Sequence, residues 1–155
     1  MARTGAAWRP RAALGCVALV LVLSLAGCQS ELDRFADQLR PLDRQLAAQK
    51  ADIASTLRGA RLGNDRDARL LRQQVDGLAQ IHRSIAGLDR PGAVKTQVDR
   101  YVRANAAEVV ALTRVVAAIE AGDRAALRKA IGRARLSEED VRSSGDDLRD
   151  ALDSG

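Results

Sequence analysis

The chain has 155 residues, of which 46% are hydrophobic and only 2% aromatic, and its formal net charge is +5. This length fits one domain and is too short for several. Twelve glycines and three prolines exclude collagen-like and proline-rich disordered chains, and two cysteines exclude a small protein stapled by several disulfides. The basic balance suggests nucleic acid as a partner, so the distribution of the charge has to be examined.

The first 27 residues differ in composition from the rest of the chain. Residues 1–11 carry three arginines and no acidic residue, and residues 12–26 are almost entirely apolar. A basic region followed by an apolar stretch of this length is typical of an export signal. The stretch is shorter than the roughly 20 apolar residues that a membrane-spanning helix needs. We therefore expect residues 1–27 to direct export.

The apolar stretch ends in Leu25, Ala26, Gly27 and Cys28, and this tetrapeptide resembles the lipobox of bacterial lipoproteins. In that family the cysteine thiol accepts a diacylglyceryl group, and a signal peptidase then cuts before the cysteine. The resemblance implies a lipoprotein signal peptide over residues 1–27, lipidation of Cys28 and a lipid-anchored domain over residues 28–155. The alternative is an ordinary signal peptide or an uncut signal anchor in which Cys28 has no special role.

Removal of this segment changes the charge and the thiol content. Three of the 25 basic residues and none of the 20 acidic residues lie in residues 1–27, so the mature chain carries a net charge of about +2. Its charges of both signs interleave without a block of five like charges, and aromatic residues for base stacking are scarce. We therefore expect no nucleic-acid partner. Cys16 is lost with the segment, so a disulfide within the mature domain is not expected.

The remainder has apolar side chains at spacings that alternate between three and four, without the alternating pattern of strands. Such spacing is typical of helices that pack along an apolar seam. A first segment over about 30–59 has seam positions Leu32, Phe35, Leu39, Leu42, Leu46, Gln49 and Ile53. A second, from Asn64 or Asp65 to Gly87, has Ala68, Leu71, Val75, Leu78, His82 and Ile85. We expect Pro41 to kink the first helix or to restart it.

Two further segments continue the same spacing. The third covers about 92–121, with seam positions Val94, Val98, Tyr101, Asn105, Glu108, Leu112, Val115 and Ile119. The fourth covers 123–152, with Leu127, Ile131, Ala134, Glu138, Val141, Gly145, Leu148 and Leu152. Gly122 is a natural stop and Asp123 a natural N-cap. A break near Leu136 and Ser137 is an alternative, although the unbroken spacing favours one helix.

Four amphipathic segments with short connectors predict an all-α fold, namely an antiparallel up-down helical bundle of about four helices. The seams are rich in alanine, so we expect a narrow core with little room for a large ligand pocket. A looser three-helix arrangement and self-association through coiled coils are the alternatives.

Three of the polar residues on the predicted seams are candidates for a site, namely His82, Asn105 and Glu108. His82 suits a metal ligand or a proton shuttle. The chain has no second histidine, however, and Ala79 stands at the position where a di-iron Glu-x-x-His motif needs a glutamate. We therefore favour a structural histidine. Asn105 and Glu108 suit a buried pair that fixes register, or a small polar pocket. We favour a third interpretation, in which the seam shifts to Ala106 and Val109, because burial of an unpaired carboxylate is costly.

No catalytic arrangement emerges from the sequence. Phosphate-binding loops and calcium-loop spacing are missing, and a triad would have to use His82. We therefore expect no enzyme activity, no catalytic residues, no cofactor and no metal site. The first hypothesis for function is a membrane-anchored lipoprotein that acts as a non-enzymatic structural or interaction protein of the cell envelope. The alternative is a bundle that binds a small ligand, a metal or haem, with His82 as its anchor.

The expected partners are the lipid bilayer, through diacylglyceryl-Cys28, and either an envelope protein or a second copy of the chain. The order of Pro91, a long helix, Gly122 with Asp123, and a final helix is similar to uncharacterised small helical lipoproteins of high-GC bacteria. The resemblance places the domain on the outward face of the cell membrane. In a Gram-negative cell it implies the outer membrane, because Gln29 is not the aspartate of the usual inner-membrane retention signal.

Overall fold

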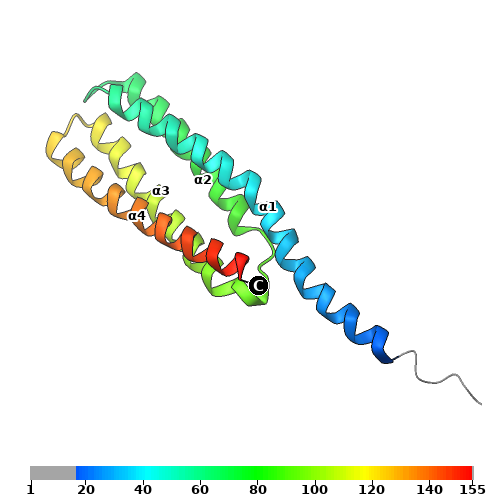
Figure 1. Cartoon of the computed structure of the whole chain (residues 1–155). Helices are drawn as coiled ribbons and strands as arrows, with labels where there is room; N and C mark the ends of the chain where they lie inside the picture. Colours follow the sequence, from blue (N-terminus) through cyan, green and yellow to red (C-terminus); the bar gives the residue numbers. More distant parts are fainter. Residues whose placement is uncertain (1–16, 155) are drawn as a thin grey trace, which may run out of the picture.

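The computed structural model describes the backbone of residues 17–154 and the side chains of residues 31–154. It contains four α-helices, α1 (Val17–Gly59), α2 (Asp65–Ala86), α3 (Lys95–Glu120) and α4 (Arg124–Asp153), and a short 3₁₀ turn, η1 (Gly92–Val94). Successive helices run in opposite directions, so the fold is the expected all-α up-down bundle (Figure 1). The described part of the chain holds no helix that is both long enough and apolar enough to cross a membrane.

The helix ends follow the predicted capping residues. The side chain of Asn64 accepts hydrogen bonds from two backbone amides of α2, and Asp123 does the same for Ala125 and Ala126 at the start of α4. Gly122 has φ of +66°, a left-handed conformation that favours glycine and ends α3. The two connectors at this end of the bundle lie together, since the Gly63 amide donates to the Ile119 carbonyl at 2.8 Å.

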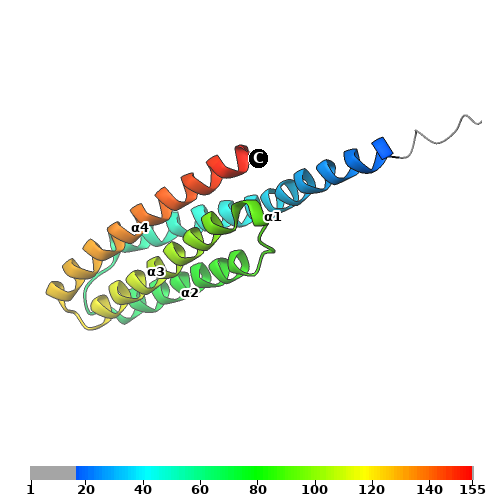
Figure 2. The same ribbon diagram turned by 90° about the horizontal axis from the view of Figure 1, so that it is seen from below.

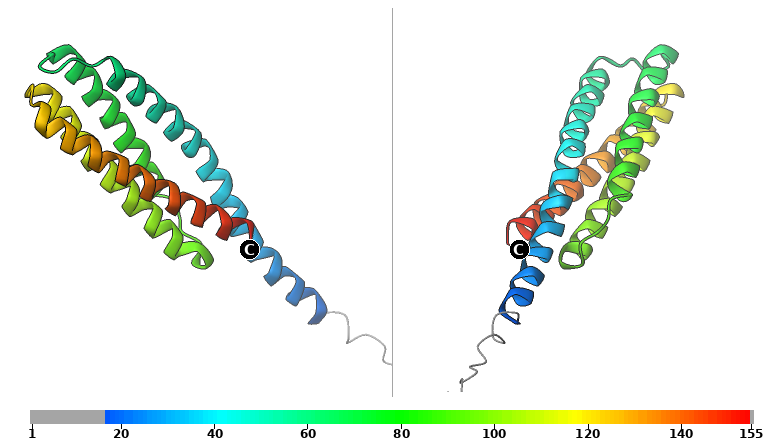
Figure 3. Two further views of the ribbon diagram at one scale, coloured as in Figure 1. Left: turned by 60° about the vertical axis from the view of Figure 1, so that its left-hand side comes forward. Right: turned by 90° about the vertical axis from the view of Figure 1, so that its right-hand side faces the viewer.

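Of the two alternatives expected at Pro41, a kink or a restart, the restart is wrong, because α1 runs on through the proline as one helix. Proline removes one backbone hydrogen bond, but the helix is already nucleated on both sides and buries Leu39 and Leu46 around it. Tertiary packing therefore maintains the helix across this position. The helix also extends beyond the other three at its N-terminal end, as both views in Figure 3 show.

The core follows the predicted seams in α2 and α3. All six seam positions of α2 are buried, and so are all those of α3 except Leu112, which is partly buried. In α4, which is continuous through Leu136 and Ser137, the seam is less covered: Val141 and Leu148 are buried, whereas Ile131 remains 36% exposed.

The helices do not close into a ring. Helix α1 packs against α2, α2 against α3, and α3 against α4 over most of its length, and α3 lies between α2 and α4 in Figure 2. Within residues 17–154 no contact of similar extent joins α1 to α4. The reason lies in the α1 stripe that faces α4, which consists of small and charged residues (Ala36, Arg40, Asp43, Ala47, Lys50 and Ala54).

A candidate binding groove between α1 and α4

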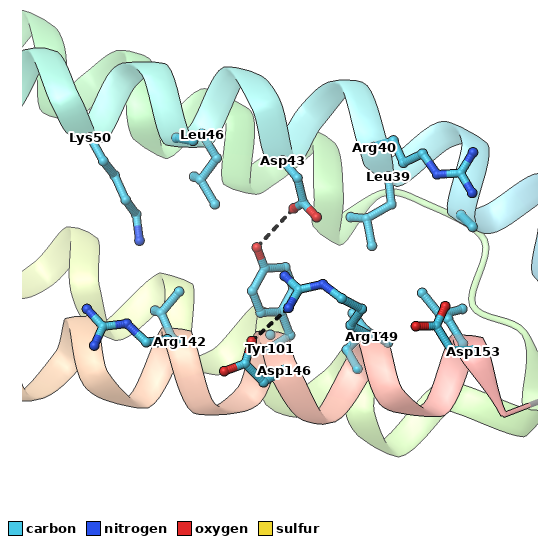
Figure 4. A pocket seen from close by; sticks show the side chains of 16 residues that line it. Leu39, Arg40, Asp43, Leu46, Lys50, Tyr101, Arg142, Asp146, Arg149 and Asp153 are labelled. Atoms are coloured by element: carbon cyan, nitrogen blue, oxygen red, sulfur yellow. Dashed lines mark hydrogen bonds and ion pairs between the residues drawn. The ribbon is translucent and has the colours of Figure 1, made fainter.

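An open groove of about 560 Å³ separates α1 from α4 in the half of the bundle that holds the C-terminus. Leu39 and Leu46 of α1 and the ring of Tyr101 from α3 form its apolar floor (Figure 4). Leu148 of α4 also lines the groove. A second hollow of about 320 Å³ continues it toward the far end of the bundle, and Lys50 lines both. The expectation of little room for a ligand pocket concerned the narrow core, whereas this groove lies open on the surface between α1 and α4.

Charged side chains of both signs form the walls of the groove. On the α4 side Arg149 pairs with Asp146 at 2.8 Å, and Arg142 lies 3.8 Å from Glu138. All four of these side chains are more than half exposed, so such pairs contribute little to stability. Arg40 of α1 pairs outside the groove with Asp37. The walls can thus form ion pairs with a partner that carries charges of both signs.

A hydrogen bond from Tyr101 ties the floor of the groove to its wall. The Tyr101 hydroxyl donates to Oδ1 of Asp43 at 3.0 Å, across the space between α3 and α1. Burial raises the pKa of the Asp43 carboxyl, although the hydrogen bond from Tyr101 opposes the rise. Burial, together with the negative charge of Asp43, also raises the pKa of Tyr101, so the phenol stays protonated. Gly145 of α4 lies against this ring, and a β-carbon there would come within close van der Waals contact, 3.4 Å from Tyr101 Cε2.

An ion pair between Lys50 and Glu108 separates the two hollows. Lys50 Nζ lies 2.8 Å from Oε2 of Glu108, whose side chain is almost wholly buried. Burial raises the pKa of Glu108, and the ammonium group of Lys50 opposes this rise. The predicted shift of the seam away from Asn105 and Glu108 is wrong, since these residues are 1% and 4% exposed whereas Ala106 is exposed and Val109 only partly buried. The carboxylate is tolerated because it has a partner on α1.

Asn105 is the other polar member of the α3 seam. Its Nδ2 donates to the backbone carbonyl of Tyr101 at 2.8 Å, while Oδ1 has no protein partner. The side chain thus belongs to the interior between α3 and its neighbours and lines neither hollow.

His82 lies in the core and does not line the groove. It is 8% exposed, and neither ring nitrogen has a hydrogen-bond partner among the described residues. Burial, assisted by the positive charge of Lys50, lowers its pKa to about 4. In residues 31–154 no three His, Cys, Asp or Glu side chains are grouped closely enough to hold a metal ion. The interpretation of His82 as a buried structural residue agrees with this position.

The proposed lipidation residue, Cys28, falls within the backbone of α1, but its side chain lies outside the described residues. The same holds for the other lipobox side chains, and residues 1–16 lie entirely outside the description. No protein-family model, curated protein or solved structure matches the chain.

Sequence reasoning named Tyr101 only as a seam position. It named Glu108 with Asn105 as a buried pair, a small polar pocket or a shifted edge, and it missed Asp43 and Lys50. A signal for them exists in the sequence. Residues 36, 40, 43, 47, 50 and 54 repeat the 3,4 spacing alongside the apolar seam of α1, with alanines and charged residues in place of leucines. A second stripe of this kind indicates a helix face that is not packed in an apolar core; here Asp43 and Lys50 reach polar groups of α3, and the other members face water or a partner.

Proposed function

We propose that the mature chain is a lipid-anchored protein of the bacterial cell envelope that acts by binding another envelope protein and catalyses no reaction. The basic region, the apolar stretch and the lipobox ending at Cys28 support the anchoring. Two acyl chains on one cysteine give stable attachment to a bilayer where a single chain is marginal. The observation that carries the binding role is the open groove between α1 and α4.

The occupant we propose for this groove is one amphipathic helix of the partner protein. The two hollows follow α1 from Ala36 to Arg58, which corresponds to about 33 Å at 1.5 Å per residue. A helix of about 20 residues matches that length and would supply the missing contact between α1 and α4. The leucines of the floor are already buried, so its apolar face would meet the apolar side chains that stay partly exposed along the two hollows (Leu57, Leu112, Ile131 and Leu152). Its flanks would meet walls that carry both signs of charge.

The position of the groove fits the anchor. Cys28 precedes Ala36 by eight residues of one continuous helix, or about 12 Å. A chain held by Cys28 would therefore present the groove close to the lipid surface, where the juxtamembrane helices of other envelope proteins lie.

A small apolar ligand is the second candidate occupant of the groove. The volume of the groove supports this candidate. A space of about 560 Å³ falls within the usual range of ligand pockets. Lipid extraction and mass spectrometry of the purified protein test it, since a carrier would release a stoichiometric small molecule.

The partner helix is tested by photo-crosslinking in intact cells, with a crosslinking amino acid at Ala47, which lines the groove, or at its exposed neighbour Ala48, which does not. We expect the Ala47 probe to mark one protein at residues spaced three and four apart, and the Ala48 probe to mark it at least about tenfold less. Equal labelling from both positions, or labelled residues without helical spacing, would contradict the proposal.

A further inference from the structure

Helix α4 separates its charges by sign along its length. Residues 124–137 contain five basic residues and no acidic residue, whereas residues 138–153 contain seven acidic residues and two arginines. All of these charged side chains lie on the exposed part of the helix. The helix therefore has a basic first half and an acidic second half.

This order of charges, basic in the first half and acidic in the second, does not stabilise helix α4 by itself. A helix carries partial positive charge at its N-terminus and partial negative charge at its C-terminus, so acids are favoured early and bases late. Helix α4 has no acid in its first turn and no base in its last. It also places like charges four residues apart, as in Lys129 with Arg133 and Asp146 with Asp150, which repel each other. The capping carboxylate of Asp123 offsets only part of this cost.

The separation is sharpest on the side of α4 that faces away from α1. Lys129 and Arg133 lie there in the first half, and Asp140 and Asp147 in the second. Arg100 of α3 pairs with Asp147 at 2.7 Å, and Arg103 of α3 lines the same hollow as Asp140, so two arginines of α3 offset the acids at this end. The side chains of Arg100 and Asp147 stay about half exposed or more, which leaves them accessible to a second copy.

Exposed apolar side chains mark the middle of the same surface. Leu136 is 65% exposed and Val110 of α3 is 50% exposed, and both border a shallow recess of about 490 Å³ together with the small residues Ala106 and Ala107. Leu136 lies within one turn of the midpoint of α4, where the charge changes sign. An apolar centre between oppositely charged ends is the usual composition of a protein interface.

We propose that this surface pairs with the same surface of a second copy, with the two α4 helices antiparallel and a two-fold axis near Leu136. Antiparallel pairing places the basic half of each α4 over the acidic half of the other, whereas parallel pairing would oppose like charges. The surface is thus complementary to itself, as a two-fold interface requires. Leu136 and Val110 of both copies meet at the axis, and the nearby alanines let the helices approach closely.

The proposed pair is compatible with anchoring, because a two-fold axis along the membrane normal lays both bundles on one bilayer with their Cys28 residues at opposite ends. It uses a different side of α4 from the groove, so the proposal stands independently of the proposed partner helix.

Disulfide crosslinking between two differently tagged copies in intact cells tests the proposal. One copy carries Lys129→Cys and the other Asp147→Cys, and Ser84→Cys on the exposed side of α2 is the matched control. After oxidation we expect the yield of mixed Lys129→Cys and Asp147→Cys dimers to be at least about tenfold above the yield of Ser84→Cys dimers. We expect no such excess when both copies carry Lys129→Cys. Dimers of Lys129→Cys with itself would overturn the proposal by showing parallel pairing, and equal dimer yields from all pairs would overturn it by showing no specific pairing.

A charge-reversal series keeps the result independent of cysteine reactivity. We expect Lys129→Glu with Arg133→Glu to abolish co-purification of two tagged copies, and a partner copy with Asp140→Lys and Asp147→Lys to restore it. Circular dichroism of each variant confirms that the bundle is intact. If the second charge-reversed copy does not restore co-purification although all variants are folded, charge complementarity does not hold the copies together.

Discussion

The buried imidazole of His82 gives the folding stability a dependence on pH. Its pKa falls from 6.5 to about 4 on burial, so the unfolded chain binds a proton between these pH values when the folded chain does not. The stability that His82 contributes is therefore complete above pH 6.5 and is lost as the pH falls toward 4. We expect a loss of about 2 kcal/mol between pH 7 and pH 5 from this residue.

His82→Leu tests this dependence by urea denaturation at the two pH values. The variant keeps an apolar side chain of similar size at the seam and removes the titrating group, so its free energy of unfolding should fall less between pH 7 and pH 5 than that of the wild type. The raised pKa values of Asp43 and Glu108 act in the opposite direction in both proteins and cancel in the comparison. An identical fall in both proteins would contradict the assignment.

The sequence pattern predicted the burial of His82 correctly, whereas the preferred interpretation of Glu108 as an edge residue was wrong. Both outcomes have the same physical reason. A lone histidine at a seam position has no partner to find, so periodicity alone places it in the core. The burial of Glu108 depends on Lys50, which lies 58 residues away along the chain and 2.8 Å away in space. Pairing across helices requires the relative placement of α1 and α3, which local spacing does not contain.

At the scale of the helix, local signals placed the boundaries of α2 and α4 accurately. A direct prediction concerns Asp123, whose side chain accepts hydrogen bonds from the Ala125 and Ala126 amides at 2.9 Å. Asp123→Ala should lower the free energy of unfolding by about 1 kcal/mol, and Asp123→Asn by much less, because asparagine caps equally well. Chemical denaturation measures both, and equal losses for the two variants would show that the cap contributes nothing.

Two features of the helices could be recognised only from the structure. Pro41 suggested a break in α1, but packing on both sides of it keeps the helix continuous. The failure of α1 and α4 to pack follows from the stripe of alanines and charges on α1, whose meaning depends on which helix it faces. Apolar seams therefore predicted the number and order of the helices, but not the groove.

At the scale of the whole molecule, three features fit together: the anchor, the groove and the far side of α4. A short α1 segment connects Cys28 to the bundle, the groove is the proposed site for a partner helix, and the far side of α4 is the proposed contact with a second copy. All three are proposals, the first from the lipobox and the other two from the arrangement of the helices. Each surface has its own test, so failure at one leaves the other standing.

Lipidation of Cys28 is the proposal on which the anchoring depends, and mass spectrometry of the chain isolated from cell membranes tests it. We expect a polypeptide that begins at Cys28 and bears a diacylglyceryl group, and we expect Cys28→Ala to yield an uncut chain without lipid. The full 155-residue chain found in the cytosol with residues 1–27 still attached and Cys28 unmodified would contradict it.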